Sequence, residues 1–216
     1  MSTTPMQSNQ AAAPELAQIE FEPMSRGELI AKGAIAAAAI YGVSAAGSFA
    51  RSAFAQGGGG DVDILNYALT LEYLESAFYA MALEQADLDK DVSKAAETIS
   101  KDEDAHVKAL SGTIKDMGAK PVKAPGVDFG DAFASQDSFL QTAITFEDLG
   151  VSAYNGAAPM IKSKELLGVG GSIVQVEGRH AGVIRFLAGE PPAPEAFDQA
   201  LDMDAVLKAA TPFIKA

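Results

Sequence analysis

Hydrophobic residues recur at three- and four-residue intervals in four separate stretches of the chain between residues 61 and 189. This spacing places them on one face of an α-helix, so each stretch is predicted to form an amphipathic helix. The recurring positions include Leu65 and Leu83 in the first stretch and Met117 at the end of the second. The methionines and phenylalanines in general are expected in the core. The four helices are predicted at about 61–85, 92–117, 136–158 and 172–188.

The connections between these helices have unequal lengths. The first and third are short, and three glycines within 168–171 are expected to lie in the third connection, just before the fourth helix. Residues 119–135 form a long connection with two prolines, two glycines and no helical periodicity. A short, long, short series predicts an all-α four-helix bundle with one long crossover between helices two and three.

The chain divides into four regions by composition and pattern. The bundle is preceded by a segment rich in small and polar residues and by a glycine run, and it is followed by two adjacent prolines. The expected regions are a disordered N-terminus with an export signal (1–55), a flexible glycine tether (56–60), the bundle (61–189), and a C-terminal tail (190–216) with a short helix near 204–210 that packs on the bundle.

The order of residues before the tether indicates an export signal. Arg26 and Lys32 precede an uncharged alanine-rich run, which closes on a small-x-small cleavage pattern, Ala-Phe-Ala, at 53–55. The first arginine resembles the start of a twin-arginine signal, but Gly27 stands where the second arginine belongs. A Sec signal and an uncleaved membrane anchor therefore remain alternatives. We expect export to the periplasm or cell envelope, with membrane contact only through this segment if it stays uncleaved.

Composition removes several classes of chemistry. The chain has no cysteine, which excludes disulfides, thiolate-bound zinc, iron–sulfur clusters and thiol catalysis. A formal net charge of −13 has the wrong sign for a protein that must neutralise nucleic-acid phosphates. Histidine chemistry is limited to two residues, His106 and His180.

The candidate chemistry lies where the apolar stripes are interrupted. Each predicted helix carries one glutamate near its middle, and two of these glutamates have a histidine three residues later, which puts both side chains on the same helix face. The helix hairpin also repeats: TLEYLESAFY at 70–79 aligns with TFEDLGVSAY at 145–154. The candidate metal ligands are Glu72, Glu103, His106, Glu147, Glu177 and His180.

Four carboxylates that meet inside a bundle need compensation. A buried carboxylate costs several kcal/mol unless it is paired, and the stripes contain no lysine or arginine to pair with. Two divalent cations balance four carboxylates in formal charge. Carboxylate oxygens with imidazole and without thiolate favour iron or manganese over structural zinc. The pattern therefore predicts two metal ions, iron or manganese.

Three further residues lie beside the candidate ligands. Tyr79 and Tyr154 each follow their glutamate by seven residues, and either hydrogen-bond a ligand carboxylate or simply pack. We include both as candidate residues behind the ligands. Glu75, one turn after Glu72, either flanks the site or accepts a hydrogen bond behind it. Arg179 and Arg185 are expected to be surface or ion-pair residues rather than catalytic ones.

One Glu, a Glu-x-x-His, a second Glu and a second Glu-x-x-His on four helices with one crossover resemble the ferritin-like di-iron carboxylate superfamily. The similarity covers about residues 62–189. With the predicted export signal, the LNYALTLEYLESAFY start and the PEAFDQALDMDAVLKAATPFI ending, the chain is similar to exported bacterial ferritin-like proteins of the desiccation-related type.

The resemblance implies a role for each candidate ligand. Glu72 and Glu147 would be terminal carboxylates, and Glu103 and Glu177 would bridge the two metals. The two histidines would be terminal nitrogen ligands, and Tyr79 would lie beside the metals, as a tyrosine does in several members.

Three kinds of function are compatible with these observations. The first is a redox enzyme that oxidises Fe²⁺ or consumes O₂ or peroxide, as a di-iron oxidase or a dimanganese catalase-like centre. The second is metal binding or storage without turnover. The third is a structural, stress-protective envelope protein. The partners are then metal ions with O₂ or peroxide, and a homo-oligomer is compatible with each.

Overall fold

The computed structural model describes residues 60–215. The expected export signal (1–55) and all of the tether except Gly60 lie outside the described residues. No helix between residues 60 and 215 combines the length and the hydrophobicity that crossing a bilayer requires. The alternative of an N-terminal anchor also falls outside the described part of the chain.

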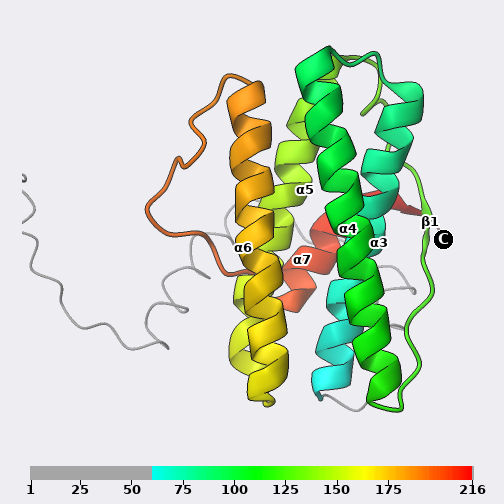
Figure 1. The fold of residues 1–216 in the computed structure, drawn as a ribbon, viewed down its shortest axis with the longest axis vertical. Helices are drawn as coiled ribbons and strands as arrows, with labels where there is room; N and C mark the ends of the chain where they lie inside the picture. The colour runs from blue at the N-terminus through cyan, green and yellow to red at the C-terminus, as the bar shows by residue number, and fades with distance from the viewer. Residues whose placement is uncertain (1–59, 216) are drawn as a thin grey trace, which may run out of the picture.

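Four long helices form the bundle, which confirms the predicted all-α fold (Figure 1). The first helix packs mainly along the second and the third mainly along the fourth, so the bundle consists of two helix hairpins. The helices are α3 (Asp61–Gln85), α4 (Lys90–Asp116), α5 (Gln136–Ala157) and α6 (Lys164–Leu187).

Side-chain caps start three of these helices. The Asp89 carboxylate accepts the backbone N–H groups of the first turn of α4 at 3.0 Å. The Ser135 hydroxyl accepts the N–H of Ser138 at the start of α5, and the Ser163 hydroxyl accepts that of Leu166 in α6. Each cap satisfies a donor that has no partner within its own helix.

The prediction for the start of the fourth helix was wrong. Helix α6 begins at Lys164, so the three glycines at 168–171 lie inside it rather than before it. Each glycine weakens a helix by about 0.5–1 kcal/mol relative to alanine. The Ser163 cap offsets this cost, and so does Asp61, whose carboxylate accepts the N–H groups of Lys162 at 2.8 Å and Ser163 at 2.9 Å. These bonds join the start of α6 to the start of α3.

Several residues that were assigned to the core are exposed. In α3 the inward position after Tyr79 is Ala82, three residues on, and its neighbour Leu83 therefore points outward. Met117 lies at the C-cap of α4, beyond the last buried turn. The exposed side chains are Leu83 (37%), Met117 (44%), Met160 (45%), Phe186 (69%) and Phe197 (75%).

The crossover runs along the outside of the bundle from one end to the other (Figure 1). Near its start, the N–H of Val122 donates to the side-chain oxygen of Asn66 at 2.8 Å. A two-residue strand, β1 (Gly126–Val127), pairs antiparallel with β2 (Ile214–Lys215) at the C-terminus. Phe129 then packs against Phe78 with ring centroids 5.3 Å apart.

The C-terminal tail packs on α3 and α5. It contains α7 (Met203–Ala210), whose buried residues join a core cluster with both helices, and two short 3-10 turns complete the described elements, η2 (Ala158–Met160) and η3 (Thr211–Phe213). The tail backbone crosses directly over Gly156, where a Cβ atom would lie 1.7 Å from the carbonyl oxygen of Leu201. Only glycine permits so close an approach.

Two apolar clusters leave a polar layer between them. One cluster fills the end of the bundle around Phe78, Phe139 and Ile184, and another fills the opposite end around Leu69, Ile114 and Ile173. The four glutamates that interrupt the apolar stripes lie in the layer between these two clusters.

Candidate metal centre

The structure brings all six predicted ligands together at the middle of the bundle. Glu72 comes from α3, Glu147 from α5, and each of the other two helices contributes a glutamate and the histidine one turn later. The ring centroids of His106 and His180 lie 6.3 Å apart. The i, i+3 spacing on α4 and α6 therefore does place each Glu–His pair on one inward face.

The Nδ1 atom of each imidazole faces the carboxylates. His106 Nδ1 lies 3.2 Å from Glu72 Oε2, 3.2 Å from Glu103 Oε2 and 3.1 Å from Glu177 Oε1. On the other side, His180 Nδ1 lies 3.0 Å from Glu103 Oε1 and 3.5 Å from Glu147 Oε2. The two histidines thus complete two adjacent groups of ligand atoms.

These groups fit a pair of cations. The first contains Glu72 and His106, the second contains Glu147 and His180, and both include Glu103 and Glu177. Within each group the ligand atoms lie within 4.8 Å of one another. Two ions with shared carboxylates between them are the arrangement for which this set is suited.

Burial without hydrogen bonds supports the same interpretation. All four glutamates are completely buried. Both oxygens of Glu177, Glu103 Oε1, Glu147 Oε2 and His180 Nδ1 lack a hydrogen-bond partner among the described residues. Unsatisfied buried polar atoms are rare and costly. His180 Nδ1 and Glu103 Oε1 lie 3.0 Å apart without a hydrogen bond. Two ligand atoms of the same metal ion have this arrangement.

The pKa values of the metal-free site reflect burial and mutual repulsion. Burial raises the pKa of Glu72 well above its usual value and that of Glu147 to about 8. Burial alone would raise the pKa of Glu103 too, but the two neighbouring imidazoles lower it to about 2. Although burial opposes it, the surrounding carboxylates raise the pKa of His106 to about 12 and that of His180 to about 11. Without metal, protons supply the missing positive charge.

The two candidate tyrosines hydrogen-bond across the bundle. Tyr79 on α3 donates to Glu147 Oε1 on α5, and Tyr154 on α5 donates to Glu72 Oε1 on α3. Burial and the adjacent carboxylates raise both phenol pKa values well above 10, so both hydroxyls remain donors. Glu72 and Glu147 thus each have one oxygen held by a phenol from the other hairpin.

Sequence reasoning missed Asp102 and undervalued Glu75. Asp102 Oδ2 lies 3.2 Å from His180 Nε2, and this contact favours the tautomer that leaves Nδ1 free to bind metal. Its only sequence signal was adjacency to Glu103.

Glu75 is 3% exposed and faces the ligand carboxylates, so it does not simply flank the site. Arg185, as expected, forms an ion pair, with Asp148.

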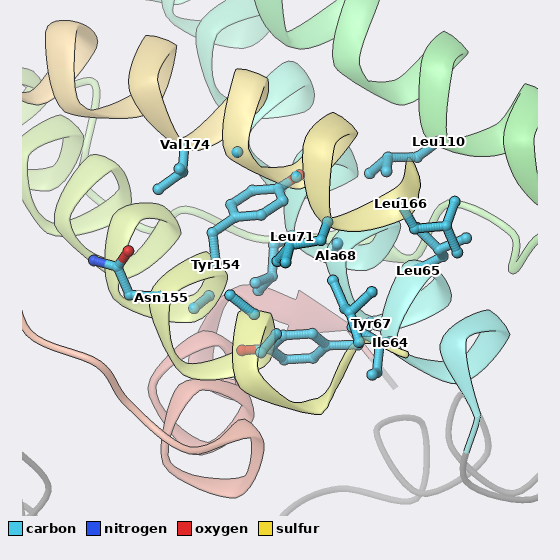
Figure 2. Close-up of a pocket in the computed structure, with 17 residues that line it drawn as sticks. Ile64, Leu65, Tyr67, Ala68, Leu71, Leu110, Tyr154, Asn155, Leu166 and Val174 are labelled. Atoms are coloured by element: carbon cyan, nitrogen blue, oxygen red, sulfur yellow. The ribbon is translucent and has the colours of Figure 1, made fainter. Parts of the chain in front are cut away.

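An apolar cavity of about 70 Å³ lies one helical turn from the ligands. Ala68, Leu110 and Val174 line it, and these residues precede or follow Glu72, His106 and Glu177 by three or four positions. Figure 2 shows Tyr154 among the lining side chains. Because its hydroxyl bonds Glu72, Tyr154 connects the cavity to the ligand set.

The sequence matches the model of the ferritin-like domain family over residues 60–190. The chain belongs to the ferritin-like family. This ferritin-like protein also resembles the crystal structure of a conserved hypothetical protein, rv2844, from Mycobacterium tuberculosis. The TM-score is 0.55 and the sequence identity 15%, over 68% of this chain and 99% of the other. At that identity the likeness supports the fold alone. A comparison with curated proteins found no significant match.

We expect the purified ferritin-like protein to bind two Fe or Mn ions per chain. Replacing both histidines (His106→Ala with His180→Ala) removes the nitrogen ligands of both groups and should abolish this stoichiometry. The exposed Glu84, on the outer face of α3, provides a control, and Glu84→Ala should retain both ions. Elemental analysis after reconstitution measures the result, and full metal content in the double variant would contradict the assignment.

Metal binding should release protons and weaken as the pH falls. The raised pKa values of both histidines and of Glu147 mean that these groups are protonated near pH 7 without metal, and a bound cation must displace their protons. The apparent dissociation constant should rise about tenfold per pH unit of acidification for each proton released. Calorimetry in buffers of different ionisation enthalpy counts these protons, and affinity independent of pH would refute the expectation.

Proposed function

We propose that this ferritin-like protein is an exported dinuclear metal protein that oxidises Fe²⁺ or consumes O₂ or peroxide. The observation that carries the proposal is the sharing of Glu103 and Glu177 by two adjacent ligand groups. No lysine or arginine is buried within residues 60–215, so cations are the natural counter-charge. Carboxylates with imidazoles suit iron or manganese, and we favour iron, with manganese as the alternative, because the chain belongs to the ferritin-like family.

Two redox-active ions, when bound, supply the electrons that reduce O₂ or peroxide. The chain's own part is to hold the ligands and limit the access of water. Tyr79 and Tyr154 each hold one oxygen of a terminal carboxylate, and Asp102 orients His180. The apolar clusters on both sides keep the ligand layer dry, which strengthens its electrostatic interactions.

The apolar cavity beside Tyr154 supports a small neutral oxidant as co-substrate. Its walls are mainly aliphatic, and it lies one turn from Glu72, His106 and Glu177. A cavity of this character favours an uncharged molecule such as O₂ over an ion. The acidic surface expected from a net charge of −13 suits the other substrate, because it attracts Fe²⁺.

Addition of O₂ to protein loaded anaerobically with two Fe²⁺ per chain should cause rapid O₂ consumption and a rise in near-ultraviolet absorbance. The His106→Ala, His180→Ala double variant should be no faster than free Fe²⁺ under the same conditions. An oxygen electrode and stopped-flow absorbance give the two readouts. If the wild-type protein binds two ions but consumes neither O₂ nor peroxide, metal storage or a structural envelope role replaces the redox proposal.

We also propose that the protein is exported and cleaved after Ala55. The basic, apolar and small-x-small series before Gln56 supports this. The exported form should then begin at Gln56, and bulky replacements at the cleavage pattern (Ala53→Leu with Ala55→Leu) should increase its mass. Mass spectrometry of the cell-envelope fraction measures both, and a wild-type form that does not begin at Gln56 would rule out cleavage there.

A further inference from the structure

The two helix hairpins are related by an approximate two-fold arrangement, and one pair of positions breaks it. Glu72 corresponds to Glu147 and Tyr79 to Tyr154, and the two tyrosine–glutamate hydrogen bonds are reciprocal. Glu75 occupies the position on α3 three residues after the terminal ligand. The corresponding residue on α5 is Gly150.

These two unequal positions face each other. The reciprocal bonds place Tyr79 level with Glu147 and Glu72 level with Tyr154. A residue three positions after each glutamate must then lie near the middle of the helix pair. The structure bears this out, because a Cβ atom on Gly150 would lie 2.9 Å from Glu75 Oε1.

The middle of the helix pair has room for only one side chain. The same Cβ position on Gly150 lies 3.2 Å from Glu177 Oε2, so any side chain there would meet two carboxylates at once. Glycine on α5 leaves the space to Glu75. A single carboxylate thus lies close to the axis that interchanges the two ligand groups.

Glu75 has no partner in the protein that accounts for its charge. It is 3% exposed, and no lysine or arginine of residues 60–215 is buried beside it. The charges that act on it are those of the four ligand glutamates, and burial together with these charges raises its pKa well above the usual value. Beside it, both oxygens of Glu177 also lack hydrogen-bond partners. A buried acid is costly in such a place unless a cation lies within its reach.

We propose that Glu75 acts as a fifth carboxylate beside the six ligands of the dinuclear centre, admitted by the absence of a side chain at Gly150, and that its charge increases the affinity of the centre for cations. This inference rests on the proposed function, because it requires that the site bind metal. The Glu75 carboxylate adds one negative charge to those of the four glutamates. It lies near the axis between the two ligand groups. Removing that charge should weaken cation binding directly.

Mn²⁺ alone is the probe, and the full chain is titrated with it by calorimetry and by electron paramagnetic resonance. The substitution Glu75→Gln keeps the shape of the side chain and removes its charge. We expect it to raise the dissociation constant for Mn²⁺ by about tenfold or more, with the metal-free variant as stable as the wild type or more so. Glu84→Gln, an exposed glutamate on the same helix, is the matched control and should leave the affinity unchanged.

A second variant guards against an effect of Glu75→Gln on folding. Glu75→Asp keeps the carboxylate charge but withdraws it by one methylene without touching Glu177, so it should fold like the wild type and weaken Mn²⁺ binding less than Glu75→Gln does. Wild-type affinity, within twofold, in folded Glu75→Gln protein overturns the inference. If the wild-type protein itself binds no Mn²⁺ or Fe²⁺, the proposed function fails and this inference fails with it.

Discussion

The cost of burying several carboxylates in one place governs this structure. Four completely buried glutamates and a fifth that is almost as enclosed lie within one layer of a helical bundle, and no buried lysine or arginine of residues 60–215 compensates them. In the metal-free protein the two imidazoles and bound protons reduce the repulsion, as the raised pKa values of both histidines and of Glu147 indicate. Such a layer is suited to cations, which can replace those protons. The rest of the fold holds the layer closed.

The bundle encloses this layer with contacts from distant parts of the chain. The crossover contributes Phe129 to the aromatic cluster at one end. The tail packs α7 against α3 and α5, and its passage over Gly156 holds it close to the helix that carries Glu147. Asp61 joins the start of α6 to the start of α3. Because these contacts link all four helices, the ligand distances depend on the whole bundle rather than on one hairpin.

The repeat of one helix-hairpin pattern explains the symmetry of the centre. Two departures from that repeat give the centre two unlike sides. The terminal glutamates, shared glutamates and tyrosines occur in matching pairs. Asp102, which holds His180, has no equivalent beside His106, because the corresponding residue on α6 is Val176. Glu75 likewise corresponds to a glycine. Both departures change the surroundings of particular ligands without changing the ligand set, so the two ligand groups are chemically different.

The sequence by itself determined the helical period, the long crossover and the six candidate ligands, because these depend on local spacing. A glutamate and a histidine three residues apart share a helix face wherever the helix lies. The sequence could not decide whether Tyr79 would hydrogen-bond a carboxylate or only pack. Nor did it show that Leu83 would face solvent or that α6 would begin before its glycines. Each outcome depends on which element packs against the residue. Only the tertiary structure placed Glu75 opposite Gly150, because the free space that admits a carboxylate there is formed by another helix, 75 residues along the chain.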